Sequence, residues 1–289
     1  MDKNSVIVIT GANSGMGKAT SVELAKTGAI VVMLCRNKAK GEEAIKEVRD
    51  LSGNSSVELM ICDLGSLKSI ENFCTEFKNR FQRLDILVNN AGVVLPGRHE
   101  TFDGYELQFG VNHLGHFLLT NRLLDIMIAS APARIINVSS GAHKIGHIHI
   151  KDVNLSKNYT AWRAYTQSKL ANILFTYELA DRLKGRGVTA NCLHPGAVAT
   201  AMGINRDTGF GTFITRILKP FFQTPEKGAQ TAVYLATSPD VEGVTGKYYY
   251  QKRPLLSSKR SYDKEMAKSL WALSEKMTGI RVDRNNRLN

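Results

Sequence analysis

Short runs of β-branched residues alternate with longer amphipathic stretches along most of the chain. The predicted strands are Val6–Thr10, Ile30–Leu34, Val57–Ile61, Ile86–Asn89, Arg134–Val138, Val188–Leu193 and roughly Thr245–Tyr249. The predicted helices are Met16–Thr27, Lys38–Leu51, Leu67–Phe81, Asp103–Ala129, Ala161–Lys184 and Pro225–Ala236. Strands that read as continuous apolar runs between helices are typical of a parallel sheet covered on both faces. The alternation predicts an α/β fold, a Rossmann-type doubly wound parallel sheet of about seven strands.

The pattern predicts one domain over residues 1–289, because no linker rich in proline or serine divides the chain. Two segments depart from the alternation. Residues 199–224 carry three glycines among apolar residues, and we expect a substrate flap there. Residues 262–277 have apolar side chains at helical spacing, which predicts a C-terminal helix that packs on the domain or on a second subunit.

Composition limits the classes of function. The formal net charge is +12, but the basic residues are spread along the chain and no DNA- or RNA-binding motif accompanies them, so we expect no nucleic-acid partner. No apolar run reaches the roughly 20 residues of a membrane span, although peripheral membrane contact stays open. The first apolar run is too short for a signal peptide. Four widely spaced cysteines are expected to be reduced thiols, and we expect a cytoplasmic protein.

A glycine-rich turn, Thr10-Gly11-Ala12-Asn13-Ser14-Gly15-Met16-Gly17, follows the first predicted strand and opens the first helix. Glycine permits the sharp turn and the close approach of backbone to a pyrophosphate, while a helix N-terminus offers free N–H groups and a positive dipole end. The alternative is a tight strand-to-helix turn without a ligand. The position of the turn after the first strand favours a dinucleotide site formed by Gly11, Asn13, Ser14, Gly15, Met16 and Gly17.

Cofactor choice depends on the end of the second strand. Enzymes that prefer NAD place an acidic residue there, whereas this chain has Cys35 followed by Arg36. An arginine suits the 2′-phosphate of NADP(H), so NADP(H) is favoured over NAD(H); the alternative is a solvated arginine. After the third strand come Asp63 and Leu64. Asp63 either accepts a hydrogen bond from adenine or caps the next helix.

Tyr165 and Lys169 are four positions apart on a predicted helix, so both lie on one face. A tyrosine has an unperturbed pKa of about 10, and a nearby ammonium lowers that pKa toward the range of proton exchange at neutral pH. An exposed pair on a helix surface is the ordinary alternative. A catalytic role for the pair is favoured because Ser139 and Ser140 end the fifth strand, at the sheet edge where such folds place their active sites.

These motifs together resemble the short-chain dehydrogenase/reductase superfamily. The ordered match includes the glycine turn, Asp63, Asn89-Asn90-Ala91-Gly92, Asn112, Ser140, Tyr165, Lys169 and Pro195-Gly196. The resemblance implies that Tyr165 is the general acid/base, that Lys169 lowers its pKa and binds the nicotinamide ribose, and that Ser140 holds the substrate oxygen. It also implies that Asn112 orders a water in a proton relay, with Ser139 as the rival serine. The implied remaining cofactor contacts are Asn90, Ala91, Gly92, Pro195, Gly196, Val198 and Thr200.

Several stretches resemble the retinol-dehydrogenase-like branch more narrowly, among them Cys35-Arg36-Asn37 and Gly110-Val111-Asn112-His113-Leu114-Gly115-His116. The resemblance implies NADP(H)-dependent interconversion of a carbonyl compound, retinoid-like or otherwise lipophilic, and its alcohol. The competing hypothesis is a non-enzymatic NADP sensor or scaffold on the same fold. By resemblance we expect a homodimer or homotetramer, with Leu170, Ile173, Leu174 and Tyr177 at a two-fold interface. The cluster His143, His147 and His149 is interpreted as loop histidines, with no metal site.

Overall fold

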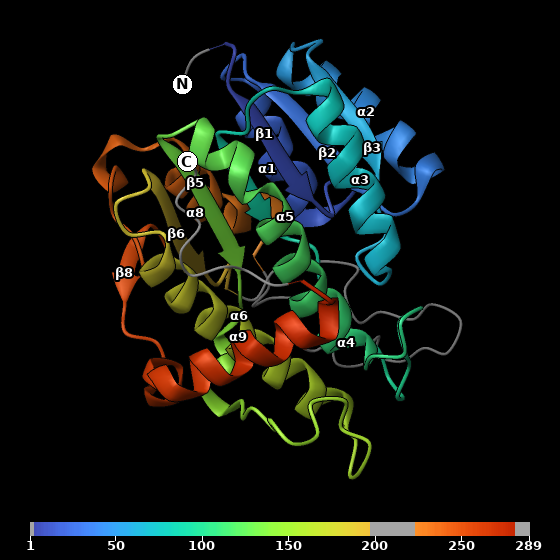
Figure 1. Ribbon diagram of the computed structural model, residues 1–289. Helices are drawn as coiled ribbons and strands as arrows, with labels where there is room; N and C mark the ends of the chain where they lie inside the picture. The colour runs from blue at the N-terminus through green and yellow to red at the C-terminus, as the bar shows by residue number, and fades with distance from the viewer. Residues whose placement is uncertain (1–2, 197–222, 281–289) are drawn as a thin grey trace.

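The computed structural model of the protein describes residues 3–196 and 223–280. Eight strands within these residues form one sheet in the order β3-β2-β1-β4-β5-β6-β7-β8, which confirms the predicted doubly wound α/β fold (Figure 1). The strands are β1 (Val6–Thr10), β2 (Ile30–Cys35), β3 (Val57–Ile61), β4 (Ile86–Asn89), β5 (Ala133–Val138), β6 (Val188–Leu193), β7 (Tyr248–Tyr250) and β8 (Arg253–Leu255). The first seven run parallel, and β8 adds an antiparallel edge that the sequence pattern did not predict.

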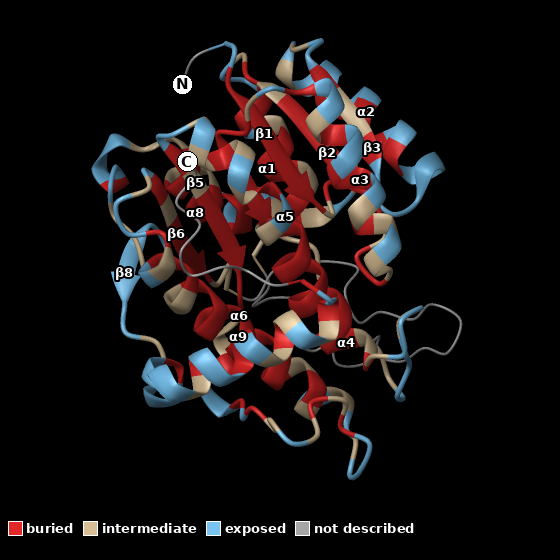
Figure 2. Ribbon diagram, in the orientation of Figure 1, coloured by how far each residue is buried: buried red, intermediate tan, exposed pale blue. Residues whose placement is uncertain are grey.

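Helices cover both faces of the sheet. They are α1 (Gly15–Ala25), α2 (Lys38–Ser52), α3 (Leu67–Arg80), α4 (Leu107–Phe109), α5 (Gly115–Ala129), α6 (Ala161–Arg182), α8 (Pro225–Thr237) and α9 (Lys264–Thr278). Alternate residues of β1 point to opposite faces: Val6 and Val8 join the core under α3, α5 and α6, whereas Ile7 and Ile9 join the core under α1, α2 and α8. Figure 2 shows central strands such as β1 and β5 buried between these layers, and the edge strand β8 exposed.

The order of the strands places a crevice at one edge of the sheet. β1 pairs with β2 on one side and with β4 on the other, so the connection from β1 to β2 and the connection from β3 to β4 run in opposite directions along the sheet. At such a point the loops that follow the two strands separate and leave room for a ligand. The glycine turn after β1 and Asn90-Ala91-Gly92 after β4 both lie there.

The predicted helix Asp103–Ala129 begins later, at Leu107, and contains a π-helical turn η1 (Gly110–Leu114) before α5. Asp103 and Gly104 lie outside it, with Gly104 at φ 78°, and the side chain of Glu106 accepts hydrogen bonds from the N–H groups of Gln108 and Phe109. A residue in the left-handed conformation does not continue a right-handed helix. The helix therefore starts at the Glu106 cap.

The C-terminal helix α9 lies against α6 (Figure 1). Its Trp271 is 2% exposed, with ring centroids 4.9 Å from Phe117 of α5 and 5.7 Å from Phe175 of α6. The guanidinium of Arg182 lies 4.1 Å from the Trp271 ring, within cation–π range. None of the described helices is long and apolar enough to cross a membrane.

Candidate active site

A cavity of about 630 Å³ opens at the carboxyl ends of β1, β2, β4 and β5. All predicted cofactor contacts within the described residues line it: Gly11, Asn13, Ser14, Gly15, Met16, Gly17, Arg36, Asp63, Leu64, Asn90, Ala91, Gly92, Tyr165, Lys169, Pro195 and Gly196. Val198 and Thr200 lie outside the described residues, as does the predicted flap 199–224 except for its last two residues. The structure thus brings together motifs that are up to 185 positions apart, from Gly11 to Gly196.

The glycine turn has the geometry of a phosphate cradle. Gly11 and Gly15 have φ of 64° and 52°, in the left-handed region that favours glycine. A Cβ on Gly17 would lie 2.3 Å from the carbonyl oxygen of Gly11, so only glycine fits against the turn. Ser14 caps α1 without a side-chain hydrogen bond, and the first turn of the helix has no acidic residue. Its backbone N–H groups are therefore available to an anion, and the turn fits a dinucleotide pyrophosphate.

Arg36 lines the cavity just after β2, is exposed, and forms no ion pair with any described residue. Cys35 instead is 1% exposed, and burial raises the pKa of its thiol to about 11 against opposing hydrogen bonds from the backbone at Ala12 and Asn13. Of these two residues, Arg36 is the one that lines the cavity, and Cys35 belongs to the core. An unpaired guanidinium at this place fits a phosphate.

Asp63 takes part in the turn that precedes α3. Its Oδ1 accepts a hydrogen bond from the N–H of Gly65 at 2.8 Å, while Ser66 is the residue that caps α3. Two roles were predicted for Asp63, adenine recognition and capping of the next helix. The cap of α3 is Ser66, so Asp63 does not have the second role. Asp63 also lines the cavity. Adenine recognition by this residue stays a prediction.

Tyr165 and Ser140 lie together on the cavity wall, one from α6 and one from the end of β5. Burial raises the pKa of the Tyr165 phenol above its ordinary value, and a hydrogen bond with the Ser140 side chain opposes that shift. Burial thus acts against the lowering expected from Lys169 in the sequence interpretation. The phenol is protonated at neutral pH and holds a proton that it can donate.

Lys169 is 2% exposed, and its Nζ donates a hydrogen bond to the carbonyl oxygen of Val138 at 3.2 Å. Burial lowers the pKa of its ammonium to about 8. A carbonyl partner is a weak compensation for a buried cation, which favours an anionic or polar neighbour in the cavity. Lys169 therefore places a buried positive charge, which costs folding stability, close to Tyr165.

The two serines at the end of β5 have different partners. The Ser139 hydroxyl is 2% exposed and donates to the main-chain oxygen of Lys169 at 2.7 Å. Ser140 caps the short helix η2 (Gly141–Ile145) by accepting from the N–H of Ala142, and it pairs with Tyr165. Ser139 thus holds the backbone of the lysine, whereas the Ser140 side chain is engaged with the phenol of Tyr165 in the cavity.

Asn112 does not line the cavity. It is completely buried in η1, where Oδ1 accepts from the N–H of Val93 at 2.7 Å and Nδ2 donates to the carbonyl oxygen of Val93 and to Oγ of Ser168. Its side-chain amide is occupied by these contacts. Its main-chain oxygen lies 3.1 Å from Nδ1 of His116, so a proton relay through a water at Asn112 stays a prediction.

The sequence interpretation missed several apolar residues of the cavity wall. Val93, Val94, Leu95 and Trp162 line it, and Trp162 is 56% exposed with its ring centroid 5.9 Å from that of Tyr165. The spacing of Trp162 and Tyr165, one turn apart on the same helix, is the signal that could have identified the tryptophan. These residues make the mouth of the cavity apolar.

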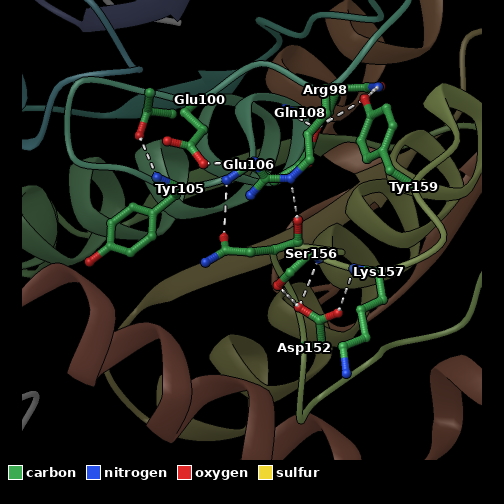
Figure 3. Close-up of polar contacts among 11 residues, drawn as sticks. Arg98, Glu100, Tyr105, Glu106, Gln108, Asp152, Ser156, Lys157 and Tyr159 are labelled. Atoms are coloured by element: carbon green, nitrogen blue, oxygen red, sulfur yellow. Dashed lines mark hydrogen bonds and ion pairs between the residues drawn. The ribbon is translucent and has the colours of Figure 1, made fainter.

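Two loops that lead away from this wall are bound to each other (Figure 3). Glu106 is completely buried; its carboxylate accepts from two backbone N–H groups, its own N–H donates to Asn154, and burial raises its pKa. Gln108 donates to the hydroxyl of Tyr159 at 3.2 Å. The first loop continues from Val93–Leu95 and the second leads into α6, so these contacts fix both sides of the cavity mouth.

The histidine cluster serves separate contacts. Nδ1 of His143 lies 2.7 Å from the main-chain oxygen of Ser140, and Nε2 accepts from the N–H of Ser258. His149 bonds to Arg163, and its ring centroid lies 4.8 Å from that of His147. Within residues 3–196 and 223–280, no three histidine, cysteine or carboxylate side chains come together as metal ligands.

Comparison with known proteins agrees with this geometry. The protein family described as short chain dehydrogenase matches residues 5–209. Human retinol dehydrogenase 14 is 44% identical over 295 residues, covering 95% of this chain and 86% of that protein. Mouse retinol dehydrogenase 12 is 46% identical over 275 residues, with coverage of 95% and 86%.

Solved structures share the fold. A protein from Mycobacterium paratuberculosis superposes with a TM-score of 0.78 at 37% identity, covering 96% of this chain and 95% of that one. The NADP complex of RhlG from Pseudomonas aeruginosa has a TM-score of 0.68 at 25% identity, with coverage of 84% and 93%.

Proposed function

The chain belongs to the short-chain dehydrogenase/reductase family, in its retinol-dehydrogenase-like branch, and from that premise we propose that it is an NADP(H)-dependent oxidoreductase. It interconverts a lipophilic aldehyde or ketone and the corresponding alcohol. The observation that carries this proposal is the placement of Tyr165 and Ser140 beside buried Lys169, in one cavity with the glycine turn.

In the direction of reduction, Ser140 and Tyr165 bind the carbonyl oxygen of the substrate. A bound dinucleotide supplies the hydride that the carbonyl carbon accepts. Tyr165 donates its phenolic proton to the oxygen, and the ammonium of Lys169, 5.8 Å from the ring centroid, stabilises the phenolate that remains. A proton from solvent then restores the phenol, through the relay predicted for Asn112. Oxidation of the alcohol uses the same groups in reverse.

Preference for NADP(H) over NAD(H) rests on Arg36, an exposed guanidinium that lines the cavity and forms no ion pair with any described residue. Paired donors of an arginine fit a phosphate monoester better than a ribose hydroxyl. The RhlG structure, which contains NADP, supports the same choice by similarity.

The proposed substrate is lipophilic because Val93, Val94, Leu95 and Trp162 form the mouth of the cavity. The names of the relatives point to a retinoid or a molecule of similar polarity. We test the function with a panel of aldehydes, ketones and retinoids, followed by loss of NADPH absorbance, with Tyr165→Phe as the control. Turnover that depends on Tyr165 supports an enzyme. NADPH binding without turnover of any panel member would favour the alternative, a non-enzymatic NADP sensor or scaffold.

Assembly as a homodimer or homotetramer stays part of the proposal, but not through the residues first expected. Leu170, Ile173 and Leu174 are at most 1% exposed within one chain: Leu170 and Leu174 pack with α9, and Ile173 packs with Tyr248. Tyr177 is half-buried and its hydroxyl bonds to Ser257 of the same chain. A second subunit would therefore have to use another surface. Light scattering at micromolar concentration tests this, and a monomer mass would contradict assembly.

We also propose a cytoplasmic location with peripheral contact to a membrane, through a cationic–apolar surface formed by Lys144, Ile145, Leu255, Leu256, Lys259 and Arg260. Leu256 is 85% exposed and Ile145 63%. Arg260 donates to the carbonyl oxygen of Gly146, which brings the two segments together. Between Glu242 and Asp263 the chain has five lysines and arginines and no acidic residue. Each such cation near an anionic leaflet contributes about 1 kcal/mol.

Sedimentation with vesicles tests this contact. We expect binding to vesicles that contain phosphatidylserine, loss of binding in Lys144→Glu/Lys259→Glu, and retention in Lys40→Glu/Lys46→Glu, which makes the same charge change on exposed positions of α2. Equal loss in both variants would show that only net charge matters. Exclusion of the intact protein from the cytoplasmic fraction of its cells would contradict the location.

A further inference from the structure

A buried histidine joins the cofactor-binding turn to the catalytic segment. His116 of α5 is 2% exposed, with Nε2 2.9 Å from Oγ1 of Thr10 and Nδ1 3.1 Å from the main-chain oxygen of Asn112. We infer that His116 is a positioning residue, which links Thr10 and the loop after β4 to the π-helical turn that carries Asn112, and through Asn112 to α6, which carries Tyr165. The inference rests on the proposed function, because it assigns a role within the same site.

The partners of His116 define its protonation. A carbonyl oxygen only accepts, so Nδ1 must carry the proton and donate to Asn112. Burial lowers the pKa of His116 to about 4, so the ring is neutral at pH 7 and Nε2 is an acceptor. The hydroxyl of Thr10 therefore donates to Nε2, which is nearer than its other candidate acceptor, the carbonyl oxygen of Val88 at 3.4 Å.

The Thr10 hydroxyl is fully used in this arrangement. Its oxygen accepts the N–H groups of Asn90 and Ala91, each at 2.9 Å, while its proton goes to His116. With the opposite tautomer, Nε2 would add a third donor to this oxygen, and an unprotonated Nδ1 would face the carbonyl of Asn112. One tautomer alone satisfies all four contacts. Thr10, Asn90 and Ala91 all line the cavity, so the network ends at the cofactor site.

The other end of the network reaches the proton donor. Nδ2 of Asn112 donates to Oγ of Ser168 at 3.0 Å, and Ser168 donates to the main-chain oxygen of Tyr165 at 2.8 Å. Hydrogen bonds thus link the loop after β4, through Thr10, His116 and the residue Asn112, to the backbone of Tyr165. Buried networks in which every member is satisfied hold their members in one geometry.

His113 provides the matched comparison within the same chain. It is 1% exposed and lies one turn before His116, but its Nε2 lies 2.9 Å from Oγ of Ser274 on α9. Both histidines fill the core and both are polar. Only His116 connects two parts of the active site, so a role limited to packing would make the two positions behave alike.

Two substitutions separate the two hydrogen bonds of His116. His116→Asn retains a donor near the place of Nδ1 and loses the acceptor for Thr10; His116→Gln retains an acceptor near the place of Nε2 and loses the donor to Asn112. We expect His116→Asn to raise the Kd for NADPH about 10-fold and to accelerate amide hydrogen exchange in residues 89–93. We expect His116→Gln to lower kcat about 10-fold, with the Kd changed less than about twofold.

The control is His113→Gln, which should lower the melting temperature while the Kd for NADPH and kcat stay within about twofold of the unmutated protein. Equal effects of Asn and Gln at position 116, or the same effects at position 113, would overturn the inference. Thr10→Val and Thr10→Ser test the network if the His116 variants do not fold. Valine should reproduce the weak NADPH binding, and serine, which keeps the hydroxyl, should not.

Titration and hydrogen exchange need no substrate. A protein that binds NADPH but reduces no carbonyl would contradict the proposed function, while the Kd and exchange rates would still decide the role of His116.

Discussion

The ammonium nitrogen of Lys169 lies 5.8 Å from the ring centroid of Tyr165, in a position where the lysine side chain is 2% exposed. Its hydrogen bond to Val138 is shared, because Nδ2 of Asn172 donates to the same carbonyl oxygen at 3.2 Å. The protein therefore keeps a charge beside its proton donor at a cost to stability. Such costs are characteristic of functional sites.

Replacement of this lysine should stabilise the protein and inactivate it. We expect Lys169→Met to raise the free energy of unfolding at pH 7 by on the order of 1–3 kcal/mol, because the buried charge is removed and Asn172 still satisfies Val138. Turnover and NADPH affinity should both fall. Chemical denaturation of the two proteins without cofactor measures the difference.

The pH dependence of that difference follows from the lowered pKa. Folding lowers the pKa of Lys169 from 10.5 to about 8, so the cost of burying the ammonium is fully present below pH 8. The cost of burying the ammonium shrinks as the pH rises from about 8 to 10.5, and it is absent above 10.5, the pKa of the lysine in the unfolded chain. The stability advantage of Lys169→Met should therefore disappear between pH 8 and 10.5. An advantage that is constant with pH would contradict the assignment.

Arg36 should decide the choice of cofactor. Arg36→Asp removes a guanidinium from the cavity and offers an acceptor to ribose hydroxyls. The value of kcat/KM with NADPH should therefore fall, and the ratio of kcat/KM with NADH to kcat/KM with NADPH should rise. We expect a change of at least about 10-fold in the ratio of the two values, the loss of one charge-assisted contact. Lys46→Asp, the same charge change on an exposed position of α2, is the control. Better use of NADH by the unmutated protein would refute NADP(H) preference.

Substitution of the neighbouring serines Ser139 and Ser140 should have different effects on turnover and stability. Ser140→Ala removes a donor to the substrate oxygen, and we expect kcat to fall about 10²-fold with little loss of stability. Ser139→Ala removes the hydrogen bond to the main-chain oxygen of Lys169, which should cost about 1 kcal/mol of unfolding free energy while kcat changes only a few-fold. Steady-state rates and melting curves distinguish them, and the reverse pattern would make Ser139 the substrate contact.

Most of the sheet was predictable because its parallel strands are buried on both faces and read as continuous apolar runs. The edge strand β8 was not. It is three residues long, contains Pro254, and follows a turn in which Gln251 and Lys252 both have positive φ, 49° and 64°. Asparagine and glycine are the usual residues of such a turn, so the local sequence carried no hairpin signal.

The cofactor turn and the helix with Tyr165 and Lys169 were predictable because each is a local motif. The Thr10–His116–Asn112 network was not, since Thr10 and His116 are 106 positions apart and meet only when β1 packs beside α5. The π-helical turn at Asn112 was equally hidden, because an apolar pattern does not distinguish an α-turn from a π-turn. The occupied side chain of Asn112 followed only from the fold.

The central claim is that Tyr165 supplies the proton, and Tyr165→Phe tests it most directly. Phenylalanine keeps the ring beside Trp162 and over Lys169, so folding and NADPH binding should survive. Once a substrate is identified, kcat for carbonyl reduction should fall by at least about 10²-fold at saturating NADPH, the lower range for loss of a general acid. A folded Tyr165→Phe protein that binds NADPH and retains near-normal kcat would contradict the mechanism.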